Sequence, residues 1–408
     1  IIMRHYLSAS VAAIAVIACS GAAFAQETTS SIRGVVTAGG APVSGAKVTV
    51  THVPSGTTNT VTTGSDGTFA TSGLRIGGPF TVKVTSSGYS DSSVTDIDLT
   101  AGQPLRLPIE LATSGGEIVV TAAKSKAIEL SPGPITSINR EKIASMATVN
   151  RDIRDIVRRD PFATIDPGQS RGVMIAGQNA RLNKFSVDGL GFTDNFGLNV
   201  GGLPTSRGPV PIDAIEQLSV KVAPFDISEG NFQGGAINIV LRSGTNKFHG
   251  SGFYSYFGDS FRGDQAKGLA KQTTKFSSKN WGGFLSGPII KDKLFFSLSY
   301  ERLEESNPPL FGIGGIGNTV PNISQAQIDN LAVTAKSVYG YDTGGLFLGG
   351  PETDEKYTAK VDWNIVDGQR FAFTYIHNKG NTANDPGFSN TGPSAPTLSL
   401  MSNDYTRP

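Results

Sequence analysis

The sequence is poor in cysteine, histidine, long apolar runs and unbalanced charge. Cys19 is the only cysteine in 408 residues, and four histidines are scattered along the chain, so we expect no disulfide, metal centre or cofactor. The net charge is +1, from 35 basic and 34 acidic residues, and no basic stripe indicates nucleic acid. No second apolar run follows the N-terminal one. Any membrane insertion must therefore use a β-barrel, because lipid accepts only helices and closed barrels.

The N-terminus has the pattern of a secretory signal peptide over residues 1–25. Arg4 and His5 give a basic start, Leu7–Ala18 is largely apolar, and Ala23–Ala25 is a small-x-small cleavage site. The apolar run is shorter than the about 20 residues that span a bilayer. Cleavage before Cys19, as in a lipoprotein, is the alternative. Cleavage after Ala25 would leave a mature chain that needs no disulfide in an oxidising compartment.

Fifty glycines and only 17% charged residues favour turn-rich β structure. In residues 26–112, short β-prone runs such as Lys47–Val50 and Phe80–Val84 alternate with turns such as Asp66-Gly67. Strands at this spacing predict an all-β sandwich.

Residues 135–245 mix the two periodicities. We expect helices at 139–146 and 150–159, a further helix at 211–218, and extended segments that include 173–176, 184–189 and 230–242. This order predicts an α+β domain.

Residues 246–408 contain long runs that alternate apolar and polar positions. Leu294, Phe296 and Leu298 occupy alternate positions of one run. A second run, through Trp363, alternates apolar and polar residues in the same way. Apolar and polar faces with short turns at one end and long loops at the other are typical of outer-membrane barrels. The short turns are at 290–293 and 366–369, and the long connections at 258–279 and 307–353. We count five or six strands.

A short β-prone segment lies between the sandwich and the α+β domain, within a linker at 113–134. It consists of Glu117, Ile118, Val119, Val120, Thr121 and Ala122. Polar, flexible flanks suit such a strand to pairing with the sheet edge of another protein. An ordinary edge strand is the alternative.

The order of these modules resembles TonB-dependent outer-membrane transporters, in particular their Oar-like branch. The patterns P-V-S-G-A-K-V-T-V and D-G-T-F resemble the carboxypeptidase regulatory-like domain, a transthyretin-like sandwich with a carbohydrate-binding-like fold. This resemblance implies that the sandwich could bind a glycan or serve only as a spacer. F-S-V-D-G-L and G-G-A-I-N-I-V-L-R resemble the family's plug, and S-G-P-I-I-K-D-K-L-F-F-S-L-S-Y-E its barrel. The resemblance implies a plug at 135–245 and the first part of an antiparallel transmembrane barrel at 246–408. A complete barrel has about 22 strands, so we expect a longer protein.

The resemblance also implies active transport across the outer membrane. Residues 117–122 would be the TonB box, which pairs with TonB, energised through ExbB and ExbD, while outer-membrane lipid surrounds the barrel. The sandwich and box would lie in the periplasm. The substrate could be a siderophore, an oligopeptide or a glycan, and no substrate-binding residue is predicted. A structural or adhesion protein of the same architecture is the alternative, and a soluble periplasmic glycan-binding protein is a third.

Three motifs suggest other functions and are rejected. Residues 168–172 match G-x-S-x-G but lack the strand, helix and partners of a nucleophile elbow, so we expect no enzyme. Residues 312–317 match G-x-G-x-x-G outside any βαβ unit. Asp96 and Asp98 are expected on an exposed strand face rather than around calcium.

Overall fold

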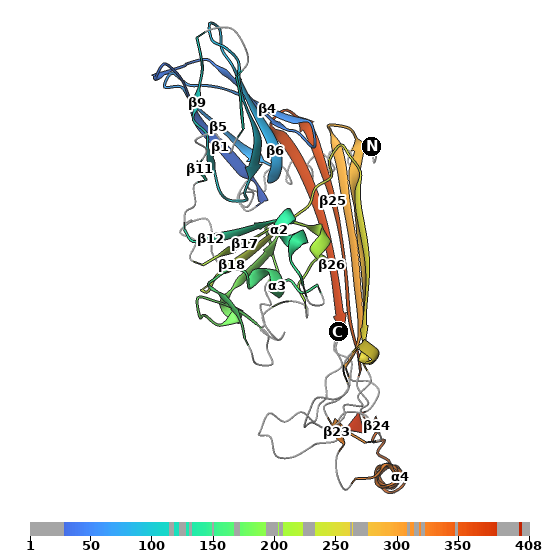
Figure 1. The fold of residues 1–408 in the computed structure, drawn as a ribbon. Helices are drawn as coiled ribbons and strands as arrows, with labels where there is room; N and C mark the ends of the chain where they lie inside the picture. Colours follow the sequence, from blue (N-terminus) through green and yellow to red (C-terminus); the bar gives the residue numbers. More distant parts are fainter. Residues whose placement is uncertain are drawn as a thin grey trace, which may run out of the picture.

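A computed structural model of the chain contains three β-rich units (Figure 1). A sandwich is followed by a mixed central unit, and a long sheet runs beside both of them. The structure describes residues 28–113, 118–121, 128–129, 133–148, 151–166, 172–192, 203, 207–222, 233–261, 263, 276–307, 311–313, 318–319, 323–346, 350–381 and 400–401. The expected signal peptide at 1–25 lies outside these residues.

The N-terminal unit is a two-sheet sandwich, as the strand spacing predicted. One sheet contains β1 (Ser30–Ala38), β2 (Ala41–Pro42), β5 (Thr68–Leu74), β8 (Leu105–Arg106), β9 (Ile109–Glu110) and β11 (Ile128–Glu129); the other contains β3 (Lys47–His52), β4 (Thr57–Thr62), β6 (Gly77–Thr85), β7 (Ser92–Leu99) and β10 (Ile118–Thr121). Alternate residues, such as Val48 and Val50 of β3 and Val82 and Val84 of β6, are buried between the sheets. Gly34 lies where a Cβ atom would meet the carbonyl oxygen of Leu107 at 2.0 Å, so only glycine fits there.

The central unit combines a five-stranded sheet with short helices. The sheet order is β12 (Ile135–Asn139), β17 (Ile215–Lys221), β18 (Ala236–Leu241), β15 (Lys184–Val187) and β16 (Leu190–Gly191). Around it lie α2 (Arg140–Ser145), α3 (Arg154–Val157), the hairpin of β13 (Ala163–Ile165) and β14 (Val173–Ile175), and the 3₁₀ turns η3 (Ala180–Leu182) and η4 (Ile212–Ala214). The two expected N-terminal helices are present but shorter, and Asn139 caps α2 by accepting a hydrogen bond from the backbone N–H of Lys142.

The prediction of a helix at 211–218 is wrong. Only Ile212–Ala214 forms a 3₁₀ turn, and strand β17 begins at Ile215. β17 pairs with β12 and β18 and buries side chains on both of its faces. A strand covered on both faces carries apolar residues without alternation, and so short a run cannot be distinguished from a buried helix by its pattern.

The third unit, called the long sheet here, is an antiparallel meander of five strands. These are β19 (His249–Gly258), β20 (Ser277–Ile290), β21 (Leu294–Asn307), β25 (Gly350–Val366) and β26 (Gln369–Asn381). One face of the long sheet is apolar and exposed, with Leu298, Trp363 and Phe373 about half exposed. The other face is polar and buried against the central unit, with Glu301 and Asp362 at 2% and 1% exposure. The predicted alternation is observed, and the described residues of the long sheet form five strands.

The two ends of the long sheet differ as expected. The short turns at its upper end lie beside the sandwich, and the long connections extend from its lower end (Figure 1). One long connection contains α4 (Gln325–Tyr339), which the sequence analysis missed, and the short strands β22 (Phe311–Gly312), β23 (Asn318–Thr319) and β24 (Gly345–Leu346), the last paired with β27 (Leu400–Met401); η5 (Asp259–Phe261) follows β19. Within the described residues, no helix is long and apolar enough to cross a membrane.

Candidate functional site at the box strand and the polar face of the long sheet

The β-prone segment after the sandwich forms a strand. Ile118–Thr121 is β10, which pairs in parallel with Ser92–Thr95 of β7 at the edge of one sandwich sheet. The other strand pairs of this sheet, β7 with β6, β6 with β3 and β3 with β4, are antiparallel. Glu117 and Ala122 lie outside the described residues. Short parallel pairing at an edge is less stable per residue than antiparallel pairing, so β10 is one of the weaker additions to the sandwich.

Backbone contacts hold the chain on both sides of β10. Before it, the N–H of Leu111 donates to Thr37 O, and the N–H of Ser90 donates to Ala112 O at 2.8 Å. After it, β11 pairs antiparallel with β8 in the other sheet. The chain thus passes from one sheet of the sandwich to the other, with β10 between the two attachments. The assignment of 113–134 as a linker that carries a TonB box stays a prediction.

A buried ion pair joins the polar face of the long sheet to the central unit. Lys360 Nζ lies 2.9 Å from Asp188 Oδ2 and donates to Leu241 O at 3.1 Å. Asp188 also accepts from Thr374 Oγ1 and from the backbone N–H of Leu241. Asp188 has a φ of 46° in the Asp188-Gly189 turn, and this turn places its carboxylate toward β25 and β26. The paired strands β15 and β18 thereby share one hydrogen-bonded charge network with the long sheet.

A second charge network lies nearer the lower half of the interface. Arg151 Nη2 lies 2.7 Å from Asp213 Oδ2, and its Nε lies 3.4 Å from Glu301 Oε2 on β21. The same guanidinium lies 3.8 Å above the ring of Phe253 on β19. Asn280 Nδ2 donates to Glu301 Oε1 at 3.2 Å. Buried charges persist only when paired and hydrogen-bonded, so these contacts fix the central unit against the long sheet.

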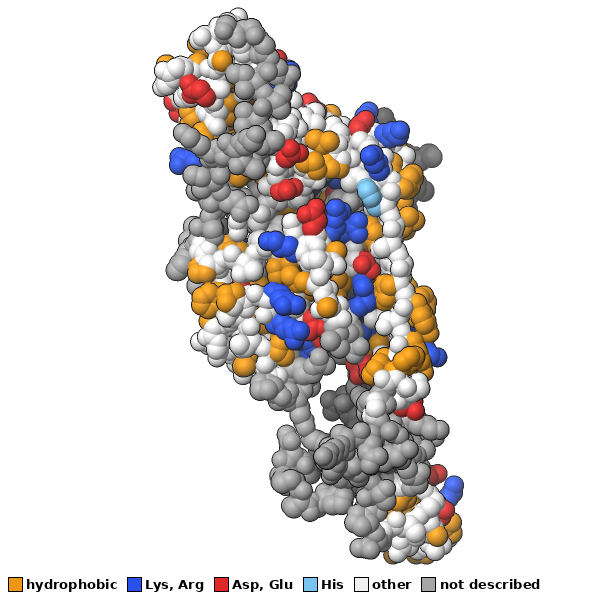
Figure 2. All heavy atoms as spheres, in the orientation of Figure 1, with side chains coloured by type: hydrophobic (Ala, Val, Ile, Leu, Met, Phe, Trp, Pro, Cys, Tyr) orange, Lys and Arg blue, Asp and Glu red, His pale blue; other side chains and the backbone are white. Residues whose placement is uncertain are grey.

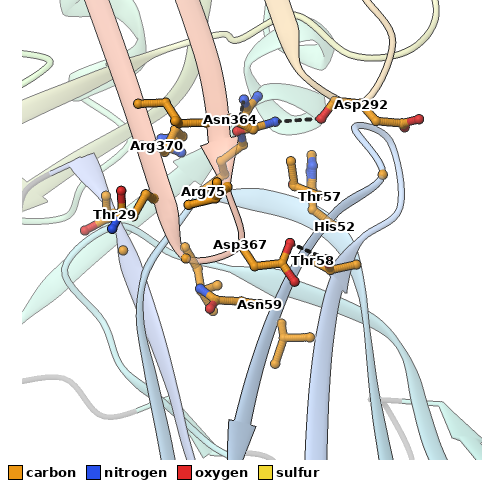
Figure 3. Close-up of a pocket in the computed structure, with 18 of the residues that line it drawn as sticks. Thr29, His52, Thr57, Thr58, Asn59, Arg75, Asp292, Asn364, Asp367 and Arg370 are labelled. Atoms are coloured by element: carbon orange, nitrogen blue, oxygen red, sulfur yellow. Dashed lines mark hydrogen bonds between the residues drawn. The ribbon is translucent and has the colours of Figure 1, made fainter.

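A third contact region lies where the sandwich meets the short turns of the long sheet (Figure 3). Thr58 Oγ1 donates to Asp367 Oδ1 at 3.1 Å. The buried Arg75 donates from Nη1 to Gly244 O and from Nη2 to Asn364 Oδ1. Burial lowers the pKa of Arg75 to about 10, although Asp362 opposes the shift. The pattern of single strands gives no indication of this contact, because its residues are far apart in the sequence.

His52, on β3, is held neutral in the same region. Its Nδ1 lies 2.6 Å from Ser55 Oγ, and its ring packs against Phe80 with centroids 4.7 Å apart. Burial, followed by the charges of Arg75 and Arg370, lowers the pKa of His52 to about 3. The sequence around this single histidine of the sandwich gave no reason to expect that it is buried and neutral.

The rejected motifs gain no site. Gly172 and residues 312–313 are described, and the rest of both glycine motifs lies outside the described residues. In the described part of the chain, no three His, Cys, Asp or Glu side chains are grouped so as to hold a metal ion.

Two family models match separate parts of the chain. One, described as a carboxypeptidase regulatory-like domain, matches residues 31–112, and the other, an outer membrane beta barrel domain, matches residues 240–343. The first coincides with the sandwich and the second covers β19, β20, β21 and α4. The expected carboxypeptidase regulatory-like domain is therefore confirmed, as is a barrel domain after it.

Two curated proteins are similar to this chain. The TonB-dependent transporter Oar of Myxococcus xanthus is 27% identical over 290 residues, which cover 67% of this chain and 26% of Oar. The "Probable TonB-dependent siderophore receptor PirA" of Acinetobacter baumannii is 31% identical over 214 residues, covering 48% of this chain and 26% of PirA. The chain thus spans about a quarter of the length of either relative. Both descriptions are of transport or reception, in agreement with the expectation of no enzyme.

Solved structures of similar proteins include the siderophore receptor PirA from Acinetobacter baumannii and the outer membrane transporter YddB from Escherichia coli. PirA has 20% identity and a TM-score of 0.38, with 60% of this chain and 31% of PirA covered. YddB has 15% identity and a TM-score of 0.42, with 62% and 34% covered. The chain is thus similar to TonB-dependent outer-membrane receptors, and its outer membrane beta barrel domain locates it in the outer membrane.

Proposed function

We propose that the protein takes up a substrate across the outer membrane by TonB-dependent active transport, and that the central unit is its plug. The supporting observation is the buried interface between that unit and the polar face of the long sheet. Lys360–Asp188 and Arg151–Glu301 are held in it, while the opposite face exposes aromatic and aliphatic side chains. An apolar outer face and a polar inner face covered by a folded domain suit a barrel in lipid whose lumen is closed.

In this proposal, residues 117–122 are the TonB box. The box would pair through its backbone with an edge strand of TonB, energised through ExbB and ExbD, and β-branched residues suit such an extended strand. In the structure, residues 118–121 of the box pair with β7, so TonB must take the place of β7. The sandwich would then hold the box at the short-turn end of the long sheet, the end we place in the periplasm.

Proline substitutions test the box. Val119→Pro or Val120→Pro removes a backbone N–H that strand pairing uses, and should abolish energised uptake. Substrate binding at the outer face and membrane insertion should remain. Val120→Ala keeps the N–H and is the matched control, expected to transport at close to the parental rate. If both proline variants take up substrate at the parental rate, the segment is an ordinary strand and not a TonB box.

A cysteine pair tests the exchange of partners. Val119 and Ser93 are opposite each other in the β10–β7 register, and neighbouring strands are about 4.8 Å apart, within reach of a disulfide. Val119→Cys with Ser93→Cys should form a disulfide that blocks uptake until a reductant is added. Val119→Cys alone is the control. If the cross-linked protein still transports, uptake does not require β10 to separate from β7.

The substrate class and the role of the sandwich are part of the same proposal. A siderophore is one candidate, because one relative is described as a siderophore receptor; an oligopeptide or a glycan is equally compatible with the chain. The sandwich could act as a spacer or bind a glycan. A structural or adhesion protein of this architecture remains the second candidate, and normal surface assembly without energised uptake would favour it.

A further inference from the structure

A cavity of about 440 Å³ lies where the sandwich, the central unit and the long sheet meet. The sandwich contributes Arg75, the central unit contributes Arg140 and Glu216, and the long sheet contributes Lys360 and Arg370. A second cavity, of about 550 Å³, adjoins it and is drawn in Figure 3. Thr28, His52, Arg75 and Arg370 line both cavities. The two cavities thus share part of their lining, and the first has walls from all three units.

The first cavity is lined by basic side chains from its floor to its mouth. Arg75 and Lys360 are buried, Arg370 is half-buried, and Arg140 and Lys247 are exposed. Figure 2 shows Lys and Arg side chains gathered beside a histidine where the sandwich meets the long sheet. Among the described residues that line this cavity, Glu216 is the one carboxylate.

The two buried cations of the cavity each lie near a carboxylate. Lys360 pairs with Asp188 at 2.9 Å, and Arg75 Nη2 lies 4.0 Å from Asp362 Oδ1. Within the described part of the chain, the side chains of Arg140, Lys247 and Arg370 have neither an ion pair nor a hydrogen bond. Three cations thus face one carboxylate, Glu216, in a hollow whose protein walls screen charge less than water does.

The pKa shifts of His52 and Arg242 agree with a positive electrostatic potential in the cavity. The pKa of His52 falls to about 3, first through burial and then through Arg75 and Arg370. Burial and the charge of Arg140 lower the pKa of Arg242. Burial raises the pKa of Glu216 in spite of nearby cations, and Asp98 adds to that rise, so the site opposes a negative charge on this one acid of the described lining.

We infer that this junction cavity binds a small oxyanion of the phosphate class, either the free ion or a phosphate ester. Guanidinium groups match the spacing of phosphate oxygens, and cations from three separate units can surround a doubly charged anion. The volume accommodates a phosphate together with water or an ester group. A bound dianion would neutralise Arg140 and Arg370 and connect the central unit to the long sheet. The inference does not depend on the transport proposal.

The test is calorimetric titration of the full-length protein in detergent with inorganic phosphate and, separately, with glycerol phosphate. We expect saturable binding of at least one probe, with the tighter one identifying the source of the phosphate group. Chloride at matched ionic strength should give no saturable heat. The double variant Arg140→Gln with Arg370→Gln should weaken binding about tenfold or more, because it removes two charged donors.

A matched variant separates the cavity from net charge. Lys47→Gln with Arg106→Gln removes two exposed cations of the sandwich outside the cavity, and should bind as the parent does. Lys247→Gln, at the exposed mouth, is a milder variant that should weaken binding without affecting folding. The inference is overturned if neither probe binds saturably, if both double variants lose affinity equally, or if neither loses any.

Discussion

The sandwich and the long sheet are built from strands with the same alternation, yet they bury opposite kinds of side chain. In β3 of the sandwich, Val48 and Val50 are buried and Lys47 is exposed. In β25 of the long sheet, Lys360 and Asp362 are 7% and 1% exposed, while Trp363 is 47% exposed. The sandwich buries its apolar side chains away from water, as a soluble domain does. The long sheet exposes its apolar side chains on its outer face, as a sheet in lipid does.

The difference shows that a buried interface can be built from charged as well as from apolar side chains. The sandwich is held by apolar burial between its two sheets, which stabilises by about 25 cal/mol for each Å² removed from water. The polar face of the long sheet is held by ion pairs and hydrogen bonds to the central unit, whose net contribution depends on every partner being present. Such an interface tolerates the loss of a single partner poorly, because the remaining charge stays buried and unpaired.

The largest effect should follow from breaking one buried pair. Lys360→Met leaves the Asp188 carboxylate buried without its cation, and should destabilise the folded protein by about 3–5 kcal/mol. Adding Asp188→Asn removes the orphaned charge and should recover most of this loss. The free energy of unfolding by urea in lipid vesicles measures both. Equal stability of Lys360→Met and the parent would mean that charge does not hold this interface.

The outer face should respond to lipid in the opposite way. Phe373→Lys places a cation on the exposed apolar face, and should cost about 2–4 kcal/mol near the bilayer centre. The matched control is Thr60→Lys on exposed β4 of the sandwich, where a surface change is expected within about 0.5 kcal/mol. Unfolding in vesicles measures the two costs. Similar costs at both positions would contradict the lipid-facing assignment.

The smallest effect concerns acid. The pKa of His52 is about 3 in the folded protein and near 6.5 when unfolded, so the unfolded state takes up the proton first. Stability should therefore fall as the pH drops below 6.5, by about 1.4 kcal/mol for each pH unit down to the folded pKa, or about 2 kcal/mol at pH 5.

His52→Asn provides the control for this pH dependence. Asparagine can keep a polar contact to Ser55, which lies 2.6 Å from His52 Nδ1, but does not titrate. Hydrogen exchange of sandwich amides in the full protein at pH 7 and pH 5 measures the loss of stability. An equal loss in His52→Asn and the parent would assign the acid sensitivity to other groups.

The sequence determined the features that depend on local pattern. The spacing of short β-prone runs and turns predicted the sandwich. Period-two alternation predicted the strands of the long sheet, with Asp367-Gly368 in a short turn, because alternate side chains point to opposite faces. The capping box of Ser324 and Gln327, followed by Gly340 at a φ of 66°, also marked α4 locally and could have been recognised.

Only the tertiary structure decided which segments meet. β17 is a strand because β12 and β18 cover it, although its apolar run also suits a helix. β10 has β7 as its partner, and Arg75 and Arg370 line one cavity from positions almost 300 residues apart. Backbone pairing and charge proximity depend on distance in space, and a single sequence carries local preferences but no record of which distant residues those preferences bring together.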